Sequence, residues 1–184
     1  MTQAHVFGRT ADSTEPPLAA WARAGLVGAA TGLRSTWGLA AIAWTAGPCD
    51  VASAAALRRP WVRGATLVAA MAELVADKSP RVPGRLSPAG LGPRLLIGAA
   101  LGAALSDRRP GDRTPLAAGA AIGAATAFAS AAAGTRWRRT ATGPHRAWND
   151  PMAAAVEDVV TAAFAWAAAW GPAAQESLGY EAAR

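Results

Sequence analysis

Stretches without any charged side chain constrain this chain more than any other feature. The clearest has 20 residues, Pro115 to Gly134, and Thr135-Arg-Trp-Arg-Arg139 follows it directly. A helix of that length spans about 30 Å, which matches the hydrocarbon core of a bilayer. Similar stretches recur along the chain, and clusters of arginine separate them. The alternation predicts an all-α, polytopic helical membrane protein.

Composition agrees with that fold class once the distribution of charge is considered. Hydrophobic residues make up 52% of the 184 residues and charged residues 16%, against roughly 25% charged in an average soluble domain. Mean hydropathy is only +0.17, because the arginines are clustered and alanine supplies most of the apolar residues. Since alanine is weakly hydrophobic, a soluble alanine-rich helical bundle stays open as an alternative.

The chain is expected to form one membrane domain over 18–172. Residues 1–17 form a polar tail that lacks the features of a signal peptide and is predicted to be disordered and cytoplasmic. Residues 173–184 form a second polar tail. Because the first apolar interval is longer than one span requires, its helix either tilts strongly or breaks near Thr31–Ser35. About five short spans are expected, at 18–48, 61–76, 90–106, 115–134 and 151–171.

An acidic segment ends the second predicted span. Glu73 and Asp77 stand four residues apart, so a helix places both on one face. Acids at the end of an apolar run must be paired, neutralised or exposed to water inside the protein. They are interpreted as a proton or cation relay, or as the counter-charge of Arg34. The alternative is pairing with Lys78 or Arg81 at the membrane edge, which span length favours for Asp77 but not for Glu73.

A second acidic segment begins the last predicted span. Glu157 and Asp158 are adjacent and therefore point about 100° apart on a helix, so both cannot face one cavity. Asn149-Asp-Pro151 is a helix-start signal, which favours acids in the early turns for structural reasons alone. Arg34 must meet an acid or an aqueous cavity, unless the helix breaks there at a wet interface. The candidate buried polar site comprises Arg34, Glu73, Asp77, Glu157 and Asp158.

A weak internal repeat relates the two halves of the chain. Val27-Gly-Ala-Ala-Thr31 matches Ile122-Gly-Ala-Ala-Thr126, and an apolar segment with an acid pair follows each. With one unpaired span between the halves, the match predicts an inverted repeat of two helices. A chance match is the alternative, because the chain is rich in alanine.

Arginines and tryptophans suggest the orientation in the membrane. With five spans, ten basic residues lie on the side of the N-terminus and seven on the other, which weakly favours a cytoplasmic N-terminus in the cell membrane. Arg136, Arg138 and Arg139 are interpreted as anchors that also suit anionic lipid headgroups. Most tryptophans are expected at the membrane interfaces, whereas Trp37 and Trp44 are candidates to line a cavity.

Several classes of function lack their motifs in this sequence. The net charge of +6 is spread between apolar segments without a continuous basic stripe, so nucleic acid is not an expected partner. Cys49 is the only cysteine, and His5 and His145 are far apart in the sequence. No phosphate-binding loop, HExxH, serine elbow or CxxC motif occurs. We therefore expect no cofactor, no metal site and no assigned catalytic residues; a membrane protein without enzymatic activity is favoured, and an enzyme stays open as an alternative.

Three segments carry a resemblance to a known family. They are Gly32-Leu-Arg-Ser35, Glu73-Leu-Val-Ala-Asp-Lys-Ser-Pro80 and Asn149-Asp-Pro-Met-Ala-Ala-Ala-Val-Glu-Asp158. The chain resembles an uncharacterised bacterial membrane-protein family, domain of unknown function 4126. The family continues the acidic motif with a further Asp, where this chain has Arg81-Val-Pro-Gly84. The resemblance implies a multi-pass α-helical membrane protein and no established reaction.

The function predicted from these patterns is a small transporter or channel-like permeation protein that uses buried carboxylates. The alternatives are a structural or lipid-interacting membrane protein, and an intramembrane enzyme that uses Glu73 or Glu157 as acid or base. The expected partners are the lipid bilayer, a small ion or solute, and further copies of the chain.

Overall fold

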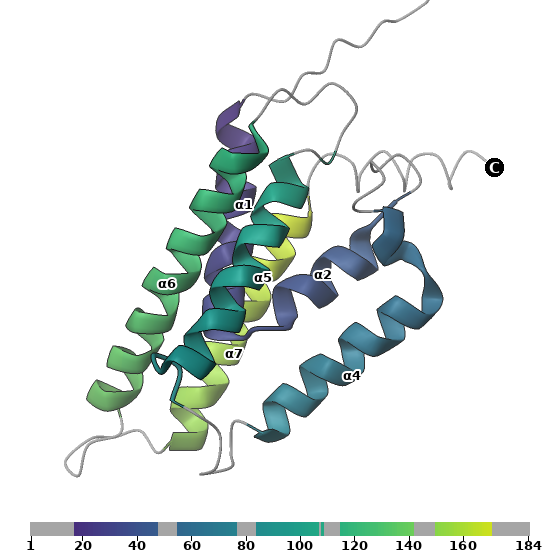
Figure 1. The fold of residues 1–184 in the computed structure, drawn as a ribbon. Coiled ribbons are helices and arrows are strands. Elements are labelled where there is room, and N and C mark those ends of the chain that lie inside the picture. Colours follow the sequence, from purple (N-terminus) through teal and green to yellow (C-terminus); the bar gives the residue numbers. More distant parts are fainter. Residues whose placement is uncertain are drawn as a thin grey trace, which may run out of the picture.

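The regular structure of the described residues is entirely helical, which confirms the predicted all-α class. The computed structural model describes residues 17–47, 55–76, 84–106, 108, 115–141 and 150–170. Asp77 and both predicted tails, apart from Pro17, lie outside these ranges. The elements are α1 (Pro17–Leu33), α2 (Trp37–Thr45), the 3-10 helix η1 (Ala56–Arg58), α4 (Pro60–Ala76), α5 (Pro88–Ser106), α6 (Leu116–Ala141) and α7 (Asp150–Ala169) (Figure 1).

Helix length separates the elements into two groups. Within the described residues, α5, α6 and α7 are long and apolar enough to cross a membrane. Helices α1 and α4 have 17 residues each, about 25 Å, and α2 has nine. Four predicted spans thus correspond to α4, α5, α6 and α7. Helix α6 also continues past Gly134 to Ala141, so its arginines lie on the helix rather than beyond it.

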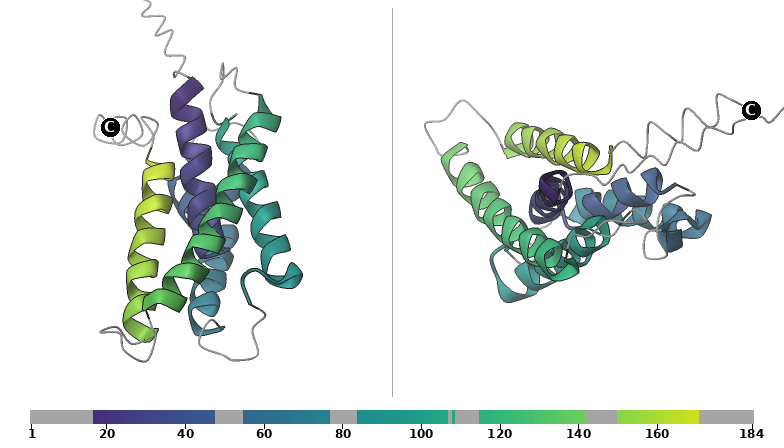
Figure 2. Two further views of the ribbon diagram at one scale, coloured as in Figure 1. Left: turned by 90° about the vertical axis from the view of Figure 1, so that its left-hand side faces the viewer. Right: turned by 90° about the horizontal axis from the view of Figure 1, so that it is seen from above.

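The first predicted span, 18–48, is two helices and not one crossing. Helix α1 ends at Leu33, and α2 begins at Trp37 and runs back toward the end of the bundle where α1 starts (Figures 1 and 2). The two helices pack closely at Gly38, where an added Cβ atom would lie 2.8 Å from Thr31 Oγ1 and 3.0 Å from Val27 Cγ2. The break predicted near Thr31–Ser35 is therefore confirmed, and the absence of a side chain at Gly38 permits the fold-back.

Glycines bring α1, α5 and α6 into backbone contact at the centre of the bundle. Gly123 of α6 lies between Gly28 of α1 and Gly98 of α5, and a Cβ atom at Gly98 would be 2.8 Å from the Gly123 carbonyl oxygen. Close helix contact through small residues is the packing mode expected within lipid. The larger buried side chains of the core lie beside these contacts, namely Val27, Ile42, Leu101 and Leu105.

The two matched sequence segments lie in contact with each other. Gly25 of α1 faces Ile122 of α6, and Gly32, two turns later, faces Ala127. Positions rise together along both helices, so α1 and α6 run in the same direction, as Figure 1 also shows. An inverted repeat requires opposite directions, and the predicted inverted relation is therefore not found for this pair.

Large apolar side chains cover much of the outer surface. Leu96 of α5 is 75% exposed, Val159 of α7 is 70% exposed and Val68 of α4 is 69% exposed. Soluble monomers rarely expose apolar side chains on this scale. The surface is compatible with contact to membrane lipid.

Candidate functional site

A break between α1 and α2 is the starting point of the candidate site. Arg34, Ser35 and Thr36 connect the two helices, and the Arg34 N–H still bonds to the Ala30 carbonyl at 2.8 Å. The first N–H groups of a helix have no partner within that helix. Thr36 does not cap α2 with its own side chain. The start of α2 therefore needs an acceptor from another part of the chain.

Glu73, near the end of α4, supplies that acceptor. Its carboxylate accepts bonds from the Ser35 N–H (2.6 Å), the Thr36 N–H (3.0 Å) and the Thr36 hydroxyl (2.8 Å). The Arg94 guanidinium of α5 lies 3.6 Å from the same carboxylate. The dipole of α2 also favours a negative charge at this position. Glu73 thus connects α4 and α5 to the helix break.

Arg34 is buried and pairs with Asp158 of α7. Only 3% of the Arg34 side chain is exposed; its Nε donates to Asp158 Oδ1 at 2.7 Å, and its Nη2 lies 2.6 Å from the same oxygen. The expectation that Arg34 meets an acid is confirmed. Glu73, for which the counter-charge of Arg34 was one predicted role, instead binds the backbone that follows Arg34.

Glu157 belongs to the same cluster of charged side chains as Arg34, Asp158, Glu73 and Arg94, which is called the charged cluster below. Its side chain is 2% exposed, and it accepts from Arg85, which precedes α5, and from Arg138 Nε of α6 at 3.0 Å. Gly134 of α6 faces this carboxylate, and a Cβ atom there would lie 2.7 Å from Glu157 Oε1. The missing side chain leaves the space that the carboxylate occupies.

All of these groups lie at the end of the bundle where α4 ends and α5 and α7 begin. Glu157 and Asp158, which were predicted to point apart, contact different arginines. Of the predicted site, Arg34, Glu73, Glu157 and Asp158 are brought to this end. Three further members of the cluster could not be singled out in the sequence, namely Arg85, Arg94 and Arg138.

The opposite end of α2 is held by arginines. Arg63 of α4 donates to the Ala43 carbonyl at 2.9 Å and to the Ala46 carbonyl at 3.1 Å. Arg108, which is 4% exposed, donates to the Thr45 carbonyl at 3.0 Å and to the last residue of α7 at 3.3 Å. Carbonyls at the end of a helix lack internal partners and favour positive charge. The nine-residue helix α2 is thus held by a carboxylate at its start and by guanidinium groups at its end.

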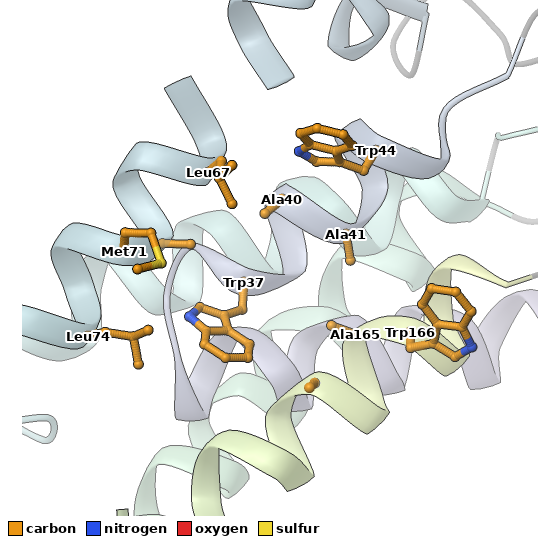
Figure 3. Close-up of a pocket in the computed structure, with 11 residues that line it drawn as sticks. Trp37, Ala40, Ala41, Trp44, Leu67, Met71, Leu74, Ala165 and Trp166 are labelled. Carbon is orange, nitrogen blue, oxygen red and sulfur yellow. The ribbon is translucent and has the colours of Figure 1, made fainter. Parts of the chain in front are cut away.

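A cavity of about 540 Å³ lies between α2, α4 and α7. Trp37 and Trp44 of α2 line it, as expected from the sequence, together with Leu67 and Leu74 of α4 and Trp166 of α7 (Figure 3). Its lining is almost entirely apolar. Trp37 directly follows the helix break, so the cavity adjoins the charged cluster.

The chemistry of the cluster favours negatively charged or hydrogen-bonding groups over cations. Four arginines face three acids among the residues named above, and each of these acids already binds at least one arginine. A cation would have to compete with those arginines for the carboxylate oxygens. In the part of the chain that the structure describes, no three His, Cys, Asp or Glu side chains are placed to hold a metal ion.

Comparison with known proteins places the chain in a family. A family model described as "Domain of unknown function (DUF4126)" matches residues 22–175. This range contains the helix break, both acidic segments and all arginines of the cluster. No curated protein and no solved structure matched the chain. The chain belongs to the DUF4126 family, whose domain has no known function.

Proposed function

We propose that this protein is an integral protein of the cell membrane that passes a small anionic solute across the bilayer. Three candidate spanning helices and the apolar outer surface support the membrane location. Permeation is supported by one observation above all, the helix break at Arg34–Thr36 with its N–H groups bound to a carboxylate. Discontinuous helices whose starts point at anionic groups are typical of substrate sites in transporters.

Glu73 occupies the place that a solute anion would take. Three donors from Ser35 and Thr36 converge on its carboxylate, and backbone N–H groups at a helix start bind any small anion in the same way. Arg94 is 3.6 Å from Glu73, so the displaced carboxylate keeps a counter-charge nearby. In this scheme the solute displaces Glu73 from α2, and the return of Glu73 releases the solute.

Flux through proteoliposomes tests this function. The purified chain is reconstituted, and uptake of chloride, acetate and phosphate is compared with uptake of potassium and with protein-free vesicles. We expect saturable, anion-selective flux. Cation flux alone, or no flux above the protein-free vesicles, overturns the proposal.

The Glu73→Gln variant tests the role of Glu73. A neutral amide competes less well than a carboxylate with the solute for the N–H groups at the start of α2. The KM for the anion should therefore fall, by about tenfold for one charged hydrogen bond lost. Maximal flux should fall as well, because release slows. Arg139→Gln is the matched control, since Arg139 is an exposed arginine on α6 at the same end. An unchanged KM in Glu73→Gln removes Glu73 from the pathway.

A structural membrane protein is the second candidate. It is favoured by the arginine partner that each acid of the cluster already has, since such pairs fix helix packing without moving a solute. In that case Glu73→Gln lowers the unfolding temperature of a protein that conducts nothing.

An intramembrane enzyme is less well supported. The Thr36 hydroxyl donates to Glu73 at 2.8 Å, which is the arrangement of a nucleophile and a base. The same carboxylate also accepts two backbone N–H groups and faces Arg94, so it is committed to holding the helix break. At the end of α6, the exposed Arg136 and Arg139 suit contact with anionic lipid headgroups.

A further inference from the structure

The indole of Trp37 is a buried donor without an acceptor. Its Nε1 atom is inaccessible to solvent and has no hydrogen-bond partner. Figure 3 shows the nitrogen turned toward Met71 and Leu74 of α4, across the cavity between the two helices. Indole N–H groups that are buried usually find a partner, because an unmade bond costs the full desolvation of the donor. This end of the cavity therefore holds one unused hydrogen-bond donor, which a ligand reaches once the neighbouring side chains shift.

Charge at that end of the cavity favours an anionic group. Trp37 directly follows Thr36, and Leu74 directly follows Glu73, so the cavity wall continues into the charged cluster. Arginines outnumber acids in the described part of that cluster. A carboxylate accepts hydrogen bonds about twice as strong as those of a neutral carbonyl. Donor and surrounding charge are thus complementary to a carboxylate.

The rest of the cavity is suited to a hydrocarbon chain. From Trp37 it extends along α2 to Trp44, with Leu67 and Ala162 among its walls. A volume of about 540 Å³ lies within the usual range for ligand sites, about 300–1,000 Å³. Removing apolar surface from water is favourable along the whole length of such a chain.

We propose that this cavity binds a long-chain fatty acid, whose carboxylate accepts the Trp37 N–H while its chain lies along α2 toward Trp44. The site is separate from the anion position at the start of α2, and binding does not require transport.

Binding of radiolabelled oleate to the full chain in detergent tests the proposal. Trp37→Phe keeps an aromatic ring and removes the N–H, and it should weaken binding about threefold to tenfold. Trp61→Phe is its matched control, because Trp61 of α4 is 68% exposed and does not line the cavity; we expect less than a twofold change. Ala162→Phe places a phenyl group in the cavity and should weaken binding, whereas Ala163→Phe, on the adjacent exposed position of α7, should leave binding intact.

Competition experiments distinguish a free fatty acid from other molecules that carry an acyl chain. Methyl oleate and a dioleoyl phospholipid should compete at least threefold more weakly than oleate. Equal competition by either one overturns the assignment of a fatty acid, and unchanged binding in both Trp37→Phe and Ala162→Phe overturns the site.

Photolabelling of the wild-type chain with a photoactivatable fatty acid tests the same site if the variants fail to fold. In the wild-type chain its label should be found on peptides from α2, α4 and α7, and unlabelled oleate should suppress it. Label that is found mainly around the exposed Phe128 of α6 contradicts the proposal. Oleate binding without anion flux supports this site while refuting the proposed transport, so the two failures are distinguishable.

Discussion

Each acid of the charged cluster joins parts of the chain that are far apart in sequence. Asp158 binds Arg34 across 124 positions, and Glu157 binds Arg85 across 72. A buried charge without its partner is strongly unfavourable, whereas a complete pair is close to neutral for stability. At the scale of single residues, these pairs therefore select one helix arrangement more than they stabilise it.

Replacing one member of the Arg34–Asp158 pair should expose this effect. Asp158→Asn leaves the Arg34 charge buried without its carboxylate, and we expect a loss of about 3 kcal/mol in the free energy of unfolding. Chemical unfolding in detergent measures it. The double variant Arg34→Met with Asp158→Leu should recover most of that loss, because neither charge of the pair remains. Equal losses in the single and double variants would contradict the idea that pairing governs this site.

The site residues whose charge is unfavourable within an apolar stretch could be predicted from the sequence, but their pairing could not. Arg34 and Glu73 stand out in the sequence because each is a charge within an apolar stretch. Arg94 and Arg138 did not stand out, since arginines near the ends of spans are ordinary membrane anchors. Which arginine meets which acid depends on how the helices pack, and no local pattern records that.

Glycine spacing is the property that organises the helices of the core. Gly123 makes close backbone contact with Gly98 of α5 and Gly28 of α1, so one position serves two helix interfaces. Packing within lipid depends on such close contacts because the hydrophobic effect does not drive helices together there.

A methyl group at Gly123 should separate the helices. Gly123→Ala places a Cβ atom against the Gly98 backbone, and we expect a loss of about 1–3 kcal/mol in the free energy of unfolding, as in other overpacked cores. Gly64→Ala in α4 is the matched control, because nothing lies within 4 Å of its added Cβ atom. It should be neutral or stabilising by about 0.5–1 kcal/mol, since alanine favours a helix over glycine. A loss in Gly64→Ala as large as the loss in Gly123→Ala would show that the close contact at Gly123 does not set the effect.

The elements themselves were largely readable from the sequence, except for the direction of α2. Helices α4 to α7 match predicted spans, because polar turns rich in proline and arginine border them. The segment Trp37–Thr45 is apolar and without charge, so it looks like the continuation of α1. Its reversal depends on Glu73 at one end and on Arg63 and Arg108 at the other, which are distant in sequence.

The reversal changes the path of the whole molecule. Helix α1 starts at the end of the bundle where α2 and α7 finish (Figure 1). Five crossings were predicted, which would put the two ends of the domain on opposite sides. The count of arginines that favoured a cytoplasmic N-terminus assumed that path.

Cysteine labelling tests the path directly. In a Cys49→Ser background, the exposed positions Leu18 and Trp170 are changed singly to cysteine, as is Leu86 before α5. We expect a membrane-impermeant maleimide to label positions 18 and 170 from one side of the membrane and position 86 from the other. Labelling of positions 18 and 170 from opposite sides would indicate an odd number of membrane crossings and would refute the reversal of α2.

The contact between α1 and α6 also determines when the protein can complete its fold during synthesis. Gly28 meets Gly123, which is 95 positions later in the chain. The ribosome makes α2, α4 and α5 before the binding surface for α1 exists, so the glycine face of α1 stays unpartnered for most of translation. Contacts of such long sequence separation form late and slowly. The nascent chain therefore depends on the insertion machinery or on surrounding lipid to shield α1 until α6 is made.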